Sequence, residues 1–290
     1  MNWHNPLIRD LVIRALQEDI GTGDITTDAV VPPDRQVAAH IRAKADGVIA
    51  GLPLLPLIFR ELDPQIRVEF LVSDGQAVTA GTTLARLEGS ARAILTGERL
   101  ALNFLQRLSG IATHTARLAE QIKFYSCRLT DTRKTTPGLR ILEKYAVSVG
   151  GGFNHRFGLY DAVLIKDNHI AVAGGIFEAV SAVRKRLGHT VKIEVEVETL
   201  EQVAQALESR VDIIMLDNMP VEMMKQAVKM IDGRAVVEAS GCITEENIQE
   251  VAKTGVDYIS VGALTHHIRA LDISLEIEPE PARTGTDGTQ

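Results

Sequence analysis

Apolar residues recur with two different periods along the chain, and the change of period divides it in two. From Cys127 onward, six short apolar runs alternate with segments whose apolar residues recur at helical spacing. The runs are 128–131, 162–166, 191–197, 212–217, 235–240 and 258–262. This alternation predicts a parallel sheet with right-handed crossovers. About six strands are fewer than the eight of a closed α/β barrel, so we expect an incomplete barrel.

The residues before Cys127 predict a smaller α+β unit. Pro6 to Asp19 has one apolar face and a proline suited to the first helical turn. Residues 37–43, 66–70 and 83–87 alternate apolar and polar side chains, as half-buried strands do. A long helix is predicted from Ala91 to Leu108 and a second one up to about Phe124. The segment 109–113 is expected to separate these two helices because it holds Ser, Gly and Thr.

The patterns together predict an α/β protein of four parts. An N-terminal α+β sandwich domain is expected over residues 1–112 and an α/β barrel catalytic domain over 113–270. Residues 271–278 alternate apolar and polar side chains, which predicts a final strand that returns to the N-terminal domain. Residues 279–290 are rich in Pro, Gly, Thr and charge, which predicts a disordered tail.

Composition narrows the class of protein. The chain has 290 residues, of which 45% are hydrophobic and 24% charged, as in globular proteins with a substantial core. No apolar run approaches the roughly 20 residues needed to span a bilayer. The N-terminus lacks the features of a signal peptide. The two cysteines form no metal-ligand spacing, so a cytoplasmic protein with no disulfide framework is expected.

Positive charge gathers between Asp131 and His169 although the net charge of the protein is −7. A local excess of cations in an acidic protein favours a small polyanionic ligand, because nucleic acid usually meets a broadly basic surface. A solvated basic face is the ordinary alternative. The interleaved Gly and Asn residues and the position of two cations after apolar runs argue against that alternative.

The predicted strand ends carry three kinds of chemistry. The first strands deliver cations, the middle strands deliver acids, and the last two end in small residues that lead into helices. Arginine forks bind carboxylates, strand-end acids bind ribose hydroxyls or Mg²⁺, and N–H groups at helix starts bind phosphate. Glu194 lies on the same strand face as Glu196 and is left open between a ligand role and a salt bridge inside the barrel, to Lys192 or to a neighbouring strand.

Several ordered motifs resemble those of nicotinate-nucleotide pyrophosphorylase (carboxylating), also called quinolinate phosphoribosyltransferase. The resemblance covers nearly the whole chain except the tail, and this many blocks in order is far more specific than any single one. The blocks are EDIGTGDITT at 18–27, GERLALN at 97–103, SGIAT at 109–113, DTRKTTPGLR at 131–140, GGGFNHR at 150–156, KDNH at 166–169 and SVGALT at 260–265.

This resemblance implies an activity and an assembly. The family transfers the phosphoribosyl group of phosphoribosyl pyrophosphate to quinolinate and removes one carboxylate. The products are nicotinate mononucleotide, pyrophosphate and CO₂, in de novo NAD biosynthesis. The resemblance also implies Mg²⁺, no organic cofactor, and a homodimer in which the N-terminal domain of one subunit caps the barrel of the other. No nucleic-acid or membrane partner is expected.

The resemblance also assigns residues, motif by motif. It implies that Arg133, His155, Arg156 and Lys166 surround the quinolinate carboxylates, with Arg99 joining them from the partner subunit. Lys134 and Lys166 are expected to face phosphoribosyl pyrophosphate, and Glu196 and Asp217 to serve the ribose and its Mg²⁺. The substrate-binding set is completed by Thr132, Ser240, Gly241, Cys242, Val261, Gly262 and Ala263, and the catalytic set is Lys134, Lys166, Glu196 and Asp217.

One residue departs from the family pattern, and other activities stay open. Cys242 stands where the family has glycine, which is tolerable for a backbone phosphate contact if its φ stays negative. A related transferase could act on another pyridine carboxylate. A barrel lyase could form a Schiff base through Lys166. A non-catalytic sensor of phosphorylated ligands is the third alternative, but it does not account for acids beside the cations.

Overall fold

The computed structural model describes residues 1–279, which form two compact units. Among the described residues, Met1–Gly110 and 270–279 make the first unit, and Ile111–Arg269 make the second. The predicted tail lies outside the described residues apart from Pro279. In this part of the chain, no helix is long and apolar enough to cross a membrane.

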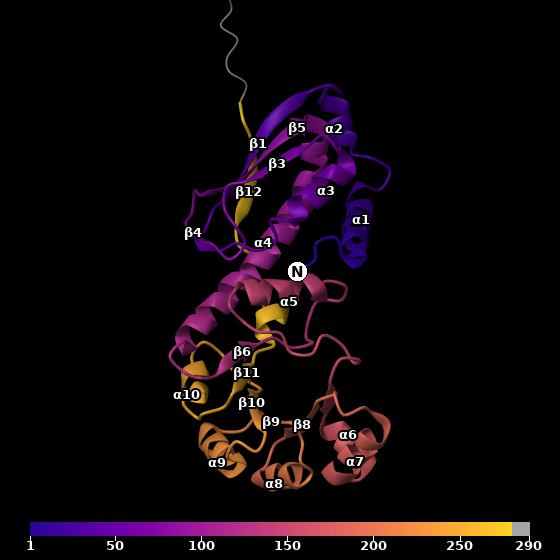
Figure 1. Cartoon of the computed structure of the whole chain (residues 1–290). Coiled ribbons are helices and arrows are strands. Elements are labelled where there is room, and N and C mark those ends of the chain that lie inside the picture. The colour runs from indigo at the N-terminus through magenta and orange to yellow at the C-terminus, as the bar shows by residue number, and fades with distance from the viewer. Residues whose placement is uncertain (280–290) are drawn as a thin grey trace, which may run out of the picture. The chain divides into compact units, whose positions relative to one another are not determined.

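The first unit is built on a four-stranded antiparallel sheet in the order β12-β1-β5-β3. The final strand β12 pairs with β1, so the end of the described chain belongs to the same sheet as its beginning (Figure 1). The elements are α1 (Pro6–Ile20), α2 (Ile25–Val30), β1 (Gln36–Ala43), β2 (Gly47–Val48), α3 (Leu54–Leu62), β3 (Arg67–Phe70), β4 (Ala77–Val78), β5 (Thr83–Ser90) and β12 (Ile273–Ile277).

The expected break between two helices after Leu108 is wrong. The structure has one continuous helix, α4 (Ala91–Ile122), which is divided between the two units at Gly110. Ser109 is fully buried, and its hydroxyl accepts a hydrogen bond from Ala50 N at 3.1 Å. A polar side chain that finds a partner in the core does not need to end the helix, so tertiary packing overrides the local signal.

The second unit is a six-stranded parallel sheet in the order β6-β11-β10-β9-β8-β7, which confirms the predicted incomplete α/β barrel. Figure 1 shows α7, α8 and α9 on one side of its strands. The elements are β6 (Arg128–Thr130), α5 (Arg140–Val149), β7 (Val163–Ile165), α6 (Asp167–Ala173), α7 (Ile176–Arg186), β8 (Ile193–Val197), α8 (Leu200–Glu208), β9 (Ile213–Asp217), α9 (Val221–Ile231), β10 (Val236–Ser240), α10 (Ile248–Ala252), β11 (Tyr258–Ser260) and α11 (Ala263–His266).

Local signals explain where the barrel helices begin and end. Thr199 caps α8 through a reciprocal pair of hydrogen bonds with Gln202, as a capping box does. Pro220 precedes α9, and Asp232 ends this helix in the left-handed conformation. Because each helix returns the chain to the same end of the sheet, all strands are parallel and their carboxyl ends meet at one edge. The functional side chains are therefore expected at that edge.

Candidate active site

A cavity of about 520 Å³ lies at the carboxyl ends of the parallel strands. It draws residues from the end of every strand of the sheet, together with the segment before β7. Eleven of the predicted site residues line it: Thr132, Arg133, Lys134, His155, Arg156, Lys166, Glu196, Asp217, Ser240, Gly241 and Cys242. The sheet therefore brings together side chains that are up to 110 positions apart in the sequence (242 − 132).

The cavity lining includes two arginines and two lysines, which are Arg133, Arg156, Lys134 and Lys166. The guanidinium groups of Arg133 and Arg156 influence each other, and each has a buried Nε with no hydrogen-bond partner among the described residues. Burial, and then the charge of Arg133, lowers the pKa of Arg156. Clustered, incompletely partnered guanidinium groups are suited to a ligand that carries several carboxylate oxygens.

The acids predicted for the ribose and metal lie at the ends of two neighbouring strands. Glu196 Oε2 accepts a hydrogen bond from Lys166 Nζ at 2.7 Å, and Asp217 Oδ2 accepts one from Asn218 Nδ2 at 2.7 Å. Among the described residues, each carboxylate keeps a second oxygen that no protein donor occupies. Two carboxylates with available oxygens in a hydrated cavity fit Mg²⁺, which prefers a few oxygen ligands and keeps several waters.

The loop after β10 has the shape expected of a close approach between backbone and ligand. Gly241 has a φ of +91°, and a Cβ atom there would lie 2.1 Å from Asn218 Oδ1. No other residue fits this position without displacing the neighbouring strand end. The Gly262 position is also tight, because a Cβ atom would lie 2.9 Å from Cδ of Lys134. These contacts hold the small-residue loops against the functional side chains.

Cys242 does not meet the condition under which cysteine would be tolerated. Its φ is +51°, in the left-handed region that favours glycine. Cysteine is therefore strained at this position of the loop. Gly241 and Cys242 both take positive φ values in the turn after β10, and the backbone at Gly241 lies against Asn218.

Replacement of Cys242 by glycine is expected to stabilise the protein by about 0.5–1 kcal/mol. Glycine removes a left-handed strain of roughly 1–2 kcal/mol, and part of this gain is lost to the greater entropy of glycine in the unfolded chain. Urea-induced unfolding of the two proteins measures the difference. Cys127→Ala is not a suitable comparison because it opens a buried site, so the exposed substitution Ser73→Gly serves as the control, and no gain in stability is expected from it.

Four predicted residues do not line the cavity. Val261 and Gly262 connect β11 to α11, and Ala263 is the first residue of α11. Ser260, the last residue of β11, lines it instead. Arg99 is exposed and lies on the part of α4 that belongs to the first unit. Its contribution from a partner subunit stays a prediction.

A buried acidic pair beneath the cavity was not predicted as part of the site. Glu194 and Glu238 are 3% and 4% exposed, and Glu238 also lines the cavity. His155 Nε2 lies 3.1 Å from Glu194 Oε2 and 3.6 Å from Glu238 Oε1. Glu194 thus has its partner inside the barrel, which is His155 Nε2 and not Lys192. The available signal for Glu238 was a single acid inside the apolar run 235–240.

The hydrogen bonds of His155 fix where its proton lies. Arg156 N donates to His155 Nδ1 at 2.7 Å, so the ring carries its proton on Nε2 and points it at the acids. Burial opposes ionisation of the ring, but Glu194 and Glu238 outweigh it and raise the pKa of His155. A second ring proton would need Nδ1, which the Arg156 N–H already occupies. We therefore place the extra proton on Glu238, whose pKa is raised to about 7 by burial and by Glu194.

The same geometry argues against a metal at this cluster. The donor atoms of His155, Glu194 and Glu238 lie within 4.8 Å of one another, which is compatible with a metal ion. A neutral histidine that coordinates through Nε2 carries its proton on Nδ1 and donates it to a neighbour. Here Nδ1 accepts a hydrogen bond instead. The protons on His155 Nε2 and Glu238 therefore take the place of a metal ion in this cluster. Glu196 and Asp217 are the better candidates for Mg²⁺.

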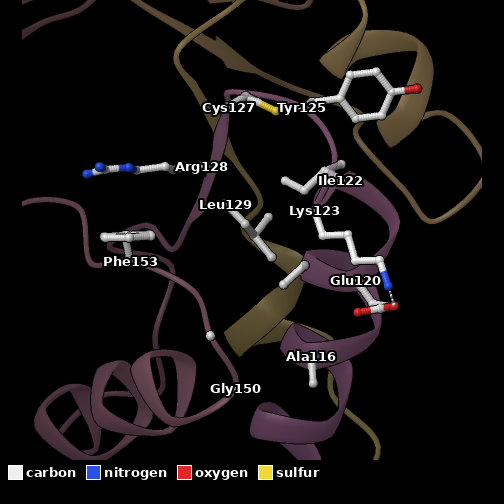
Figure 2. A pocket seen from close by; sticks show the side chains of 12 residues that line it. Ala116, Glu120, Ile122, Lys123, Tyr125, Cys127, Arg128, Leu129, Gly150 and Phe153 are labelled. Carbon is white, nitrogen blue, oxygen red and sulfur yellow. Dashed lines mark hydrogen bonds and ion pairs between the residues drawn. The ribbon is translucent and has the colours of Figure 1, made fainter.

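A second cavity of about 450 Å³ lies beside the first residues of β6 (Figure 2). Its lining comes from the end of α4, the start of β6 and the segment around Phe153. Arg128 stacks on the ring of Phe153, with 4.7 Å between the guanidinium carbon and the ring centre, and Lys123 pairs with Glu120. Arg128, Lys123 and Glu120 are thus already paired with neighbouring side chains. The described lining of this cavity therefore offers no convergent set of catalytic side chains.

Known proteins resemble this chain over nearly its full length. Family models described as the N-terminal and C-terminal domains of quinolinate phosphoribosyl transferase match residues 24–109 and 111–276. Quinolinate phosphoribosyltransferase (decarboxylating) 2, mitochondrial, of Nicotiana glauca is 44% identical over 95% of this chain and 83% of that protein. The probable nicotinate-nucleotide pyrophosphorylase (carboxylating) of Bacillus subtilis is 45% identical over 93% of each. A solved nicotinate-nucleotide pyrophosphorylase from Francisella tularensis superimposes with a TM-score of 0.90 at 45% identity, over 94% of this chain and 97% of that one.

Proposed function

Because the chain belongs to the quinolinate phosphoribosyltransferase family, we propose that it transfers a phosphoribosyl group to quinolinate and decarboxylates the product. The reaction yields nicotinate mononucleotide, pyrophosphate and CO₂ from quinolinate and phosphoribosyl pyrophosphate. It is a step of NAD biosynthesis and makes the protein a pentosyltransferase. The observation that carries this function is a single cavity in which clustered guanidinium groups face strand-end acids.

The cations of the cavity are suited to orienting the pyridine dicarboxylate. Arg133 and Arg156 supply forks for two carboxylates, and Lys166 lines the same cavity directly after β7. Lys166 is itself held by Glu196, so its ammonium group has a fixed direction. Holding the dianion with its ring nitrogen toward the ribose is a positioning effect and requires no covalent contact with the protein.

The acids are suited to the charge that develops on the sugar. As pyrophosphate leaves the anomeric carbon, positive charge builds on the ribose, and the carboxylates of Glu196 and Asp217 stabilise it. Lys134 stabilises the departing pyrophosphate. The attacking pyridine nitrogen becomes cationic, and its charge stabilises the electron pair that CO₂ leaves on the adjacent ring carbon. A proton from water then takes the place of the lost carboxylate. The substrate supplies its own electron sink in this scheme, which needs no organic cofactor.

We assign Mg²⁺ to the side of the cavity formed by Glu196 and Asp217. The ion, when bound with phosphoribosyl pyrophosphate, would neutralise the phosphate charges. These carboxylates would hold it through the oxygens that Lys166 and Asn218 do not use. The loops at Ser240–Cys242 and Val261–Ala263 are proposed to hold the 5′-phosphate through backbone N–H groups.

Release of CO₂ tests the proposed function directly. With carboxyl-labelled quinolinate and phosphoribosyl pyrophosphate, we expect labelled CO₂ and nicotinate mononucleotide in equal amounts. Nicotinate is the comparison substrate, since it has one carboxylate and leaves part of the cationic cluster unpaired. Turnover of nicotinate in preference to quinolinate would favour a related transferase with another specificity.

A homodimer with shared active sites is also proposed, with Arg99 of one subunit completing the cationic group of the other. Arg99→Ala and Lys166→Ala homodimers are each expected to be inactive. Mixing them after mild dissociation should restore up to about a quarter of the wild-type activity, because half of the dimers are mixed and each of these holds one intact site. No recovery despite heterodimers seen by native mass spectrometry would contradict a shared site.

A Schiff-base lyase has less support. Such an enzyme needs a lysine amine directed at a carbonyl carbon, whereas Lys166 Nζ donates to Glu196 at 2.7 Å. Borohydride trapping with keto acids would reveal it. Cytoplasmic placement is part of the proposal and rests on the two free cysteines, although the relative from Nicotiana glauca is named mitochondrial.

A further inference from the structure

A buried ion pair lies next to the cationic part of the cavity but does not line it. Asp131 follows β6 and is fully buried, and Lys144 on α5 is 3% exposed. Lys144 Nζ donates a hydrogen bond to Asp131 Oδ1. Neither side chain reaches the cavity surface, so the roles proposed above do not include this pair.

The pair binds the main chain of a residue that does line the cavity. Asp131 Oδ1 accepts a hydrogen bond from His155 N at 2.9 Å, and Lys144 Nζ donates one to His155 O at 3.0 Å. Asn154 Nδ2 donates to Asp131 Oδ2 at 2.6 Å and to Lys144 O at 2.8 Å. Both polar main-chain groups of His155 are thus held by one buried cluster.

The carboxylate of Asp131 extends a short ladder of backbone hydrogen bonds between β6 and the segment around Phe153. Phe153 N donates to Leu129 O at 2.8 Å, and Asp131 N donates to Phe153 O at 3.1 Å, which makes a short parallel pairing beside β6. The next donor along the segment, His155 N, meets the carboxylate of Asp131 instead of a main-chain oxygen. The segment can therefore leave the sheet at His155 and turn toward the cavity without losing its last hydrogen bond.

The electrostatics indicate that this pair contributes to geometry more than to stability. Burial raises the pKa of Asp131 and lowers the pKa of Lys144, so desolvation works against both charges. A buried ion pair of this kind is often replaceable by neutral groups of similar volume without loss of stability. What neutral groups would not reproduce is the set of charge-assisted bonds to Asn154 and His155.

We propose that Asp131, Lys144 and Asn154 are positioning residues that fix the main chain at His155 and Arg156 and thereby direct both side chains into the dicarboxylate part of the cavity. The proposal rests on the proposed function, which supplies the dicarboxylate. Arg156 depends on this main-chain position because its N–H also orients the His155 ring, at 2.7 Å from Nδ1. The cluster therefore sets the direction of Arg156 and of the His155 ring beside it.

The test uses a double substitution that keeps the pair neutral and well packed, Asp131→Asn with Lys144→Met. A single substitution would leave one buried charge without its partner. We expect the dissociation constant for quinolinate, measured by calorimetry, to rise about tenfold, which is the loss of one good charged hydrogen bond. The dissociation constant for phosphoribosyl pyrophosphate should change less than about threefold, because its acids and phosphate loops lie on other strands.

The chain offers a matched control in Lys192→Met with Asp212→Asn. Lys192 Nζ donates to Asp212 Oδ1 at 2.6 Å, and Asp212 Oδ2 accepts from Ile193 N at 2.9 Å, so this ion pair also holds a main-chain N–H. It lies at the other ends of the strands and is more exposed, with side-chain exposures of 69% and 32%. Both dissociation constants should be unchanged there. Asn154→Ala is the second test variant, because it removes hydrogen bonds while leaving the ion pair in place. It should weaken quinolinate binding about threefold.

The outcomes separate the two proposals. Unchanged quinolinate affinity in the folded double variant, or equal weakening of both ligands, would overturn the positioning role. If the double variant does not fold, Asn154→Ala decides by the same criterion. Failure of the wild-type protein to bind quinolinate would contradict the proposed function instead. In that case the ¹⁵N signals of the His155 ring still test positioning, since Asn154→Ala should change its tautomer populations and the Lys192–Asp212 control should not.

Discussion

Replacement of Arg133 by alanine is expected to lower kcat/KM for quinolinate about 100- to 1,000-fold, because each lost charged hydrogen bond is worth roughly 1.5–3 kcal/mol. Arg133 lines the cavity next to Arg156, and its Nε is buried with no partner in the described structure. An incoming carboxylate would supply that partner. Steady-state kinetics should show a higher KM and a lower turnover, since the guanidinium both binds and orients the dianion.

Two further variants make this result specific. Arg133→Lys keeps the charge but loses the planar fork, so it should recover only part of the activity. Arg184→Ala removes an arginine from α7 whose Nη2 donates to Arg210 O at 2.6 Å, and its kinetics should equal those of the wild type. Wild-type kinetics in Arg133→Ala would contradict the assignment of the cationic cluster to quinolinate.

Replacement of Glu238 by glutamine is expected to stabilise the protein by up to about 3 kcal/mol at pH 8 and by much less at pH 5. The pKa of Glu238 is raised from 4.5 to about 7, first by burial and then by the charge of Glu194. The folded protein therefore holds this proton more tightly than the unfolded chain does. Glutamine resembles the protonated acid and cannot ionise.

The sign of the pH dependence follows from that difference in proton affinity. Below pH 4.5 both states are protonated at Glu238 and ionisation costs nothing. As the pH rises from 4.5 to about 7, the unfolded chain loses its proton while the folded protein retains it, so the stability of the wild type falls. Above about pH 7 the loss is constant. The advantage of the glutamine variant should grow over this window and then level off.

Urea unfolding at pH 5, 6, 7 and 8 measures this window. Glu250→Gln is the control, because the hydrogen bond and charge of Lys253 lower the pKa of this exposed acid. Its small effect should have the opposite sign. A constant stability difference between the Glu238→Gln variant and the wild type at all four pH values would show that Glu238 is ionised throughout and that the proton lies elsewhere in the cluster.

Much of the candidate active site was predictable because its residues follow apolar runs in the sequence. Parallel strands place their carboxyl ends at one edge, so side chains such as Lys166, Glu196 and Asp217 could be expected in one cavity from their positions after apolar runs. Local rules failed where a distant partner decided the conformation. The helix α4 continues through Ser109 because Ala50 is a partner for that hydroxyl. Cys242 takes a positive φ in a turn whose preceding residue, Gly241, lies against Asn218 of another strand end.

The sequence by itself determined the α/β class, the number of barrel strands and the strand-end residues, because each depends on the period of apolar residues or on a motif within a few positions. Only the tertiary structure decided which buried acidic and basic side chains contact one another next to the cavity. The His155–Glu194–Glu238 cluster and the Asp131–Lys144 pair join residues from separate strands, segments and helices. Burial shifts the pKa values of these groups and strengthens their hydrogen bonds to the main chain. Burial is a property of the folded barrel, so no short stretch of sequence reveals it.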